Sequence, residues 1–88
     1  MNKYAIIYQW EGDLDMLALT DTFEEAKVKA IKKIKSFVKD NEGIEGKFNF
    51  VEYVKEHEDR FCAVETKNSY EFEYNHGEFI LQIKKIKI

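Results

Sequence analysis

The fold is decided by residues 22–39, whose sequence is TFEEAKVKAIKKIKSFVK. Thr22 and Glu25 form a capping box, in which a hydroxyl and a carboxylate satisfy free backbone N–H groups at the start of a helix. Residues 40–43, DNEG, supply the signal that ends it. The pattern predicts one long amphipathic helix, because its apolar residues fall within an arc of about 140°. These residues are Phe23, Ala26, Ala30, Ile31, Ile34, Phe37 and Val38.

The segments on either side of this helix alternate as β-strands do. Residues 4–10 alternate between two faces, and residues 14–20 return as the second strand of a hairpin after the turn at residues 11–13. Further strands are predicted after the helix at residues 60–66, 70–74 and 78–86, with turns at residues 67–69 and 75–77.

Residues 49–59 fit two patterns. As a strand, they would place Glu52 on the same face as Phe50 and Val54, where a carboxylate does not belong. As a helix, Asn49 is a cap with Glu52 three residues on, and Phe50 and Val54 lie near one stripe. We favour a short second helix.

The whole chain, residues 1–88, is therefore expected to be a single small α+β domain. Its antiparallel sheet should have about five strands, in the order β-β-α-(α)-β-β-β along the chain. The long amphipathic helix should pack on one face of this sheet.

Composition bears on the compartment. The chain has a net charge of −3 and one cysteine, Cys62, which fits a reducing compartment without structural disulfides. The N-terminal apolar run is shorter than a signal peptide requires, and no segment approaches the ~20 apolar residues of a membrane span. We therefore expect a cytoplasmic protein that does not enter membranes. Thirteen lysines against one arginine indicate an AT-rich genome, prokaryotic or phage.

Few residues are suited to nucleophilic or metal chemistry. The soft or borderline metal ligands are His57, Cys62 and His76, and a metal site needs three or four converging ligands. Cys62 has mostly acidic neighbours, which disfavour a reactive thiolate, so it is expected to act as a small buried apolar residue. The four glycines lie in separate turns, so no phosphate-binding loop is present. We expect no catalytic residue, no metal and no cofactor.

Two charged surfaces are candidates for binding a partner. Residues 41–79 hold ten acidic against four basic residues, a net charge of −6 that would steer association with a basic protein. The polar face of the helix carries a lysine ridge that could follow a phosphate backbone, although the near absence of arginine disfavours nucleic-acid recognition. The candidate residues are Glu65, Glu71, Glu73 and Glu78 for a protein partner, and Lys29, Lys32, Lys33 and Lys39 for a nucleic acid.

Both charge patterns also fit ordinary solubility. Glu71 and Glu73 would serve acid–base catalysis only if they were buried together. Their alternation with Tyr70, Phe72 and Tyr74 favours a solvated acidic row with the aromatic residues inward.

Residues 4–8, YAIIY, and residues 22–26, TFEEA, together resemble HicB-type antitoxin domains. Those domains place a strand hairpin before a helix that often opens with Thr or Ser, an acidic pair and Ala. The resemblance covers less than half of the chain, and the Pro-Gly segment common before that helix is absent. It implies a hairpin followed by a helix, and no functional residue is carried over.

From these features we expect a non-catalytic protein-binding module that acts through an acidic surface on a basic surface of another protein. The acidic segment and the absence of a catalytic set motivate the hypothesis of a phage or mobile-element protein that blocks a basic surface on a host enzyme. The alternative is a nucleic-acid-associated regulator that uses the lysine ridge. Binding of a small ligand in an aromatic-lined cleft is a third hypothesis.

Overall fold

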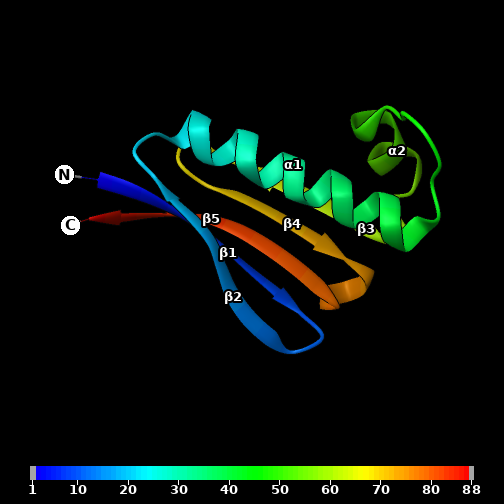
Figure 1. Ribbon diagram of the computed structural model, residues 1–88, viewed down its shortest axis with the longest axis horizontal. Coiled ribbons are helices and arrows are strands. Elements are labelled where there is room, and N and C mark those ends of the chain that lie inside the picture. The colour runs from blue at the N-terminus through cyan, green and yellow to red at the C-terminus, as the bar shows by residue number, and fades with distance from the viewer. Residues whose placement is uncertain (1, 88) are drawn as a thin grey trace.

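The computed structural model describes residues 2–87 and confirms the α+β fold, with a five-stranded antiparallel sheet and both helices on one side of it (Figure 1). The predicted strands are confirmed, with ends that differ by at most two residues. The elements are β1 (Asn2–Trp10), β2 (Asp13–Thr20), α1 (Phe23–Glu42), α2 (Phe50–Glu56), β3 (Phe61–Glu65), β4 (Tyr70–Tyr74), the 3-10 turn η1 (Asn75–Gly77) and β5 (Phe79–Lys87).

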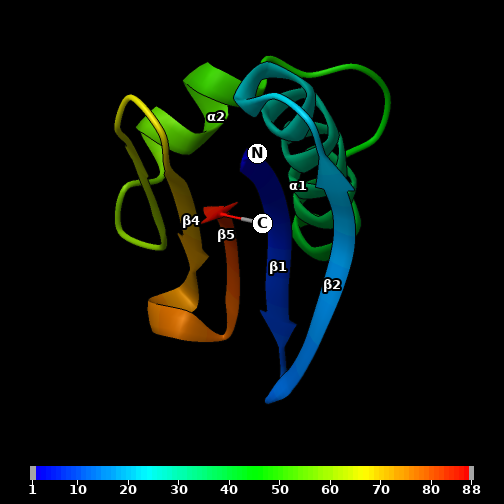
Figure 2. The ribbon, with the colours of Figure 1, turned by 90° about the vertical axis from the view of Figure 1, so that its left-hand side faces the viewer.

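The strands lie in the order β2-β1-β5-β4-β3, and every neighbouring pair is antiparallel. The first and last strands therefore lie side by side in the centre, with Ile6 opposite Ile83. β2 and β3 form the two edges of the sheet. Figure 2 shows α1 beside β1 and β2, and α2 toward the side of the sheet that holds β4.

The long helix begins and ends where the sequence signals it. The Thr22 side chain accepts a hydrogen bond from the backbone N–H of Glu25 at 3.1 Å, as the capping box predicts. Gly43 ends α1 in the left-handed conformation, with φ of 67°, and its N–H donates to the carbonyl of Lys39. Glycine suits this position because it lacks the Cβ that makes the conformation costly.

The core lies between α1 and the sheet. Its centre on the helix is Ala26, Ala30, Ile34 and Val38, all fully buried. Phe37 stacks on Phe79 with ring centroids 3.9 Å apart, and Trp10 packs against the edge of Phe37 at 4.8 Å. Aromatic contacts of this kind add to the free energy gained from buried area. Phe23 and Ile31 are half-buried and pack against the margin of this core.

The ambiguous segment is a helix. The Asn49 side chain caps α2 by accepting from the N–H of Glu52 at 3.1 Å. Phe50 is buried, with its ring centroid 6.2 Å from that of Phe72 on β4. The short helix is therefore held by its cap and by one aromatic anchor on the sheet.

A β-bulge in β2 changes which of its residues face the helices. The register between β1 and β2 shifts between Ile6 and Ile7, so Leu17 is an extra residue on β2. Alternation along β2 consequently changes phase at Leu17. Three large apolar residues thereby share the face of the sheet that points away from the helices: Leu14, Met16 and Leu19.

Candidate functional site

The sheet face opposite the helices is not covered by any element within residues 2–87 (Figure 1). On β1 this open face is formed by Ala5, Ile7 and Gln9, since their neighbours Tyr4, Ile6 and Tyr8 belong to the core beneath α1. Directly opposite on β2 lie Leu19, Met16 and Leu14, which are 47%, 57% and 72% exposed. We call the open-face patch the set Ile7, Leu14, Met16, Leu19 and Ile80.

Two of the predicted acidic residues share the open face with this patch. Glu73 lies opposite Ile80 of β5, and Glu71 lies opposite Gln82. Side chains directly opposite on neighbouring strands lie on the same face of a sheet. Glu71 is exposed and Glu73 is half-buried. The expected arrangement on β4, aromatic residues inward and glutamates outward, is therefore confirmed.

The other two predicted acidic residues lie elsewhere. Glu65 lies by the helices at the end of β3, where its carboxylate pairs with Lys27 of α1 at 2.6 Å. Glu78 lies in the turn before β5 and accepts a hydrogen bond from Asn75 at 3.0 Å. The structure thus brings together only Glu71 and Glu73.

The predicted lysine ridge divides into exposed and inward-leaning residues. Lys29, Lys32 and Lys39 are exposed on α1. Lys33 is half-buried, and its Nζ lies 4.8 Å from the centroid of the Tyr8 ring, a cation–π contact. Within residues 2–87 none of these four lysines forms an ion pair.

Of the residues considered for catalysis, Cys62 and His76 line one small hollow beside Glu73, whereas His57 ends α2 and does not line it. The His57 Nδ1 lies 2.8 Å from the carbonyl oxygen of Tyr53 at the end of α2, and His76 is in the turn η1. Cys62 is exposed, so the expectation of a buried thiol is wrong. The reason is that β3 is an edge strand and Cys62 points to the open face. No cluster of His, Cys, Asp and Glu suited to a metal ion is found within residues 2–87.

One partly buried polar cluster was not found by sequence reasoning. The Glu42 carboxylate, on a side chain only 10% exposed, accepts hydrogen bonds from Arg60 Nε at 2.9 Å and from the hydroxyls of Tyr53 and Tyr74 at 2.8 Å each. Its four donors, counting Arg60 Nη2, come from α2, β4 and the residue before β3. We call Glu42, Tyr53, Arg60 and Tyr74 together the Glu42 cluster.

Within the Glu42 cluster, the pKa values of Glu42 and Tyr74 are shifted. The hydrogen bonds from Arg60 dominate and lower the pKa of Glu42 from 4.5 to about 2, against the opposing effect of burial. Burial, followed by the hydrogen bond to Glu42, raises the pKa of Tyr74 to about 12. All of these polar groups satisfy one another, which is the pattern of a structural cluster that joins α1 to α2 and the β3–β4 hairpin.

The only hint of this cluster in the sequence is that Arg60 is the single arginine. Arginine is suited to holding a carboxylate through two hydrogen bonds. The partner, Glu42, is 18 residues away and lies in the segment that signals the end of a helix, so local pattern could not identify it.

No helix within the described residues 2–87 is both long enough and apolar enough to cross a membrane. Comparison of the chain with family models, with curated proteins and with solved structures gives no match. The local resemblance to HicB-type antitoxin domains therefore assigns no family.

Proposed function

We propose that this protein is a non-catalytic protein-binding module whose contact surface is the open face of the sheet. The observation that supports the proposal best is the open-face patch, in which Leu14, Met16 and Leu19 are 47–72% exposed side by side on β2. Contiguous exposed apolar residues of this size mark interaction sites in soluble proteins, whereas single ones are ordinary. The open face of an antiparallel sheet is otherwise usually polar.

The edge of β2 extends this surface. It runs for eight residues, Asp13–Thr20, and no strand within residues 2–87 pairs with its outer side. Exposed edge strands offer unpaired N–H and C=O groups to another chain. Lysine and proline commonly guard such edges, and β2 contains neither, but charged residues and bulges also guard edges, and β2 has Asp13, Asp15 and the bulge at Leu17. The Met16 N–H already donates to Asp15 Oδ1 at 2.9 Å, so the apolar side chains are the part of this strand that we expect a partner to contact.

Charge indicates the kind of partner. Glu71 and Glu73 form an acidic row on the same face as the open-face patch, separated from β2 by β5 and β1. A matching partner has an apolar surface bordered by lysine or arginine, because complementary charges at the rim speed association and fix orientation.

The proposal also includes a cellular compartment, an origin and a target. We place the protein in the cytoplasm, as the single cysteine favours, and in an AT-rich prokaryotic or phage genome, as the lysine-rich composition favours. An origin in a phage or mobile element is part of the proposal. Blocking a basic surface of a host enzyme is a function that needs only binding. The chain would then need no catalytic group, in keeping with the expectation from its sequence.

The experiment is capture with tagged protein from the source cell, followed by binding measurements on the captured partner. Leu14→Ser combined with Met16→Ser should weaken binding at least about tenfold, because burying each such side chain contributes about 1.5–3 kcal/mol. Val28→Ser is the matched control, since Val28 is 70% exposed but lies on α1. Equal loss of binding in the control and the double variant would contradict the proposal.

The acidic row has its own test. Glu71→Gln combined with Glu73→Gln should slow association and reduce its dependence on salt, while dissociation changes little. Sedimentation equilibrium of the free protein checks whether a second copy covers the open face instead. A stable dimer that is lost on Leu14→Ser would replace the foreign partner in the proposal.

The second candidate is a nucleic-acid-associated regulator. It is favoured by the exposure of Lys29, Lys32 and Lys39, which have no ion-pair partner within residues 2–87. Electrophoretic-mobility titrations with DNA and RNA at low salt test it. Saturable binding that is abolished by Lys29→Gln with Lys32→Gln, and that falls steeply with salt, would favour this candidate over protein binding.

A further inference from the structure

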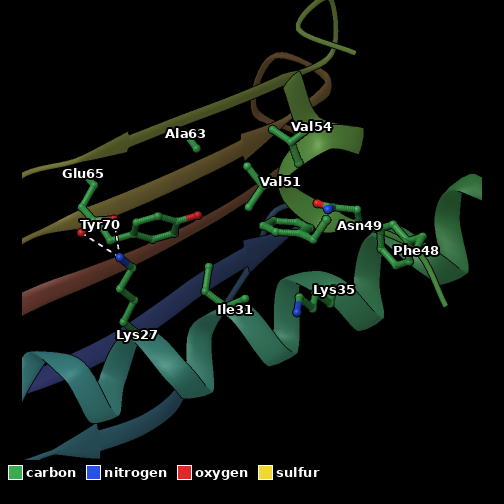
Figure 3. Close-up of a pocket in the computed structure, with 11 residues that line it drawn as sticks. Lys27, Ile31, Lys35, Phe48, Asn49, Val51, Val54, Ala63, Glu65 and Tyr70 are labelled. Carbon is green, nitrogen blue, oxygen red and sulfur yellow. Dashed lines mark hydrogen bonds and ion pairs between the residues drawn. The ribbon is translucent and has the colours of Figure 1, made fainter. Parts of the chain in front are cut away.

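A groove lies on the helix side of the sheet, between α1, α2 and the β3–β4 hairpin (Figure 3). Its volume is about 570 Å³, which is in the size range of small-molecule sites. The apolar part of its lining includes Ile31 of α1, Val51 and Val54 of α2, and Ala63 of β3. It lies on the other side of the sheet from the open-face patch, so it is independent of the proposed protein contact.

Tyr70 is the polar residue buried in this groove. It is only 6% exposed, and its hydroxyl forms no hydrogen bond with another group of residues 2–87. In Figure 3 the hydroxyl points along the groove toward Val51. No buried side-chain N or O atom within residues 2–87 lacks a hydrogen-bond partner, so the Tyr70 hydroxyl is open to solvent through the groove and can exchange a water for an acceptor on a ligand.

The hydroxyl of Tyr70 remains a donor over the whole physiological range. Burial, and after it the charge of Glu65, raises the pKa of Tyr70 to about 12. A neutral phenol in an apolar groove offers one O–H to an acceptor on a ligand.

The charges at the rim favour an anion. Lys27 and Glu65 pair at 2.6 Å and so offset each other's charge at one end of the groove. Lys35 also lines the groove and has no carboxylate partner within residues 2–87. The rim formed by these three residues therefore has one positive charge in excess.

We infer that this groove binds a small amphipathic carboxylate, with its apolar body along Ile31 and Val54 and its carboxylate accepting the hydrogen bond from Tyr70. Lys35 attracts the same carboxylate from the rim. The apolar lining supplies the affinity, while the hydroxyl and the lysine select for an anionic acceptor.

Decanoate is a suitable probe, with decanol and decyltrimethylammonium as neutral and cationic comparisons of equal chain length. Titrations are followed by amide chemical shifts of the protein, below the concentrations at which the probes form micelles. Decanoate should bind saturably, at least about threefold more tightly than the cation, with the largest shifts at Ile31, Val54 and Ala63. Equal binding of all three probes, absence of saturation, or shifts centred on the open-face patch would overturn the inference.

Variants test the contributions of the Tyr70 hydroxyl and of the Lys35 charge separately. Tyr70→Phe keeps the ring and should weaken decanoate binding about tenfold, because a hydrogen bond to a charged group contributes about 1.5 kcal/mol or more. Lys35→Gln should weaken it about two- to threefold, whereas Lys39→Gln, a lysine on the same helix outside the groove, should leave it unchanged. Unaltered binding in Tyr70→Phe would overturn the assignment of the carboxylate to that hydroxyl.

A blocking variant tests the location without disturbing the core. Val51 lines the groove but is 71% exposed, so Val51→Trp can fill the groove while α2 stays folded. It should abolish decanoate binding, and Val28→Trp, at a position 70% exposed on α1, should not. Circular dichroism checks that both variants fold. Retained binding in a folded Val51→Trp protein would refute the site.

Discussion

The Glu42 cluster gives the sharpest prediction about stability, through the substitution Glu42→Gln. The substitution keeps the size of the side chain but removes the charge that Arg60 and the two tyrosine hydroxyls surround. Lowering the pKa of Glu42 from 4.5 to about 2 corresponds to at most about 3 kcal/mol of stabilisation. The Arg60 side chain is 30% exposed, so solvent screening reduces this to about 1–2 kcal/mol at pH 7.

The pH dependence has a definite sign. The pKa of Glu42 is lower in the folded state than in the unfolded chain, so the unfolded chain takes up this proton first as the pH falls. The contribution of Glu42 is therefore complete above about pH 4.5 and is lost as the pH falls toward 2. The free energies of unfolding of the parent and of Glu42→Gln should differ most at neutral pH and converge in this window.

Urea unfolding from pH 7 to pH 2 measures this convergence. Trp10 is the single tryptophan and packs against Phe37 and Phe79, so its fluorescence reports on the core. Glu45→Gln is the control, because Glu45 is an exposed carboxylate three residues away, outside the Glu42 cluster. A difference between parent and Glu42→Gln that stays constant from pH 7 to pH 2 would refute the reasoning.

Three further predictions concern single positions. Ile34→Ala should lower the free energy of unfolding by roughly 2–5 kcal/mol in urea, because Ile34 is fully buried under the sheet and its loss leaves a cavity. An unchanged midpoint would mean that this face of α1 is not in the core. Gly43→Ala should cost about 1 kcal/mol by the same assay from backbone strain alone, since φ is 67° and no atom lies within 4 Å of an added Cβ. His57→Gln should leave partner binding within a factor of about two, because His57 ends α2 on the helix side of the sheet, away from the open face, and a folded variant that no longer binds would show that this histidine has a function.

The elements that could be predicted are those whose signals are local. The helix from Phe23 follows from one capping box and one apolar stripe, and the structure places Ile34 at the centre of the buried face. The outward position of Glu71 follows in the same way from alternation along β4. Periodicity is informative here because each of these elements has one face in the core and one outside it.

The bulge at Leu17 is the feature that local pattern misses and that matters most for the proposed site. A strand of period two would place Leu14 and Leu19 on opposite faces. The register shift places them on the same face, so the apolar patch exists only in the folded sheet. The groove and the Glu42 cluster are missed for a related reason, because each is assembled from elements distant in sequence.

The open-face patch is apolar surface that folding of the single chain does not bury. In this protein α1 and α2 together cover the aromatic face of the five-stranded sheet, and the other face stays open. Burying Leu14, Met16 and Leu19 would contribute about 5 kcal/mol in total, at about 1.5–2 kcal/mol each for side chains already partly covered. Folding gains none of this, and the bulge that gathers the three side chains disrupts strand pairing locally.

That free energy is available to association, but it is not sufficient alone. Losing translational and rotational freedom costs about 4–15 kcal/mol, so three side chains cannot hold a partner by themselves. A stable complex needs about 800 Å² from each side, an area that extends from β2 across β1 and β5 to Glu71 and Glu73. The acidic row would then lie at the rim of the contact, where charge acts on encounter and orientation. Because the partner must match both an apolar centre and an acidic rim, the selectivity of the proposed complex comes from their arrangement on one rigid sheet.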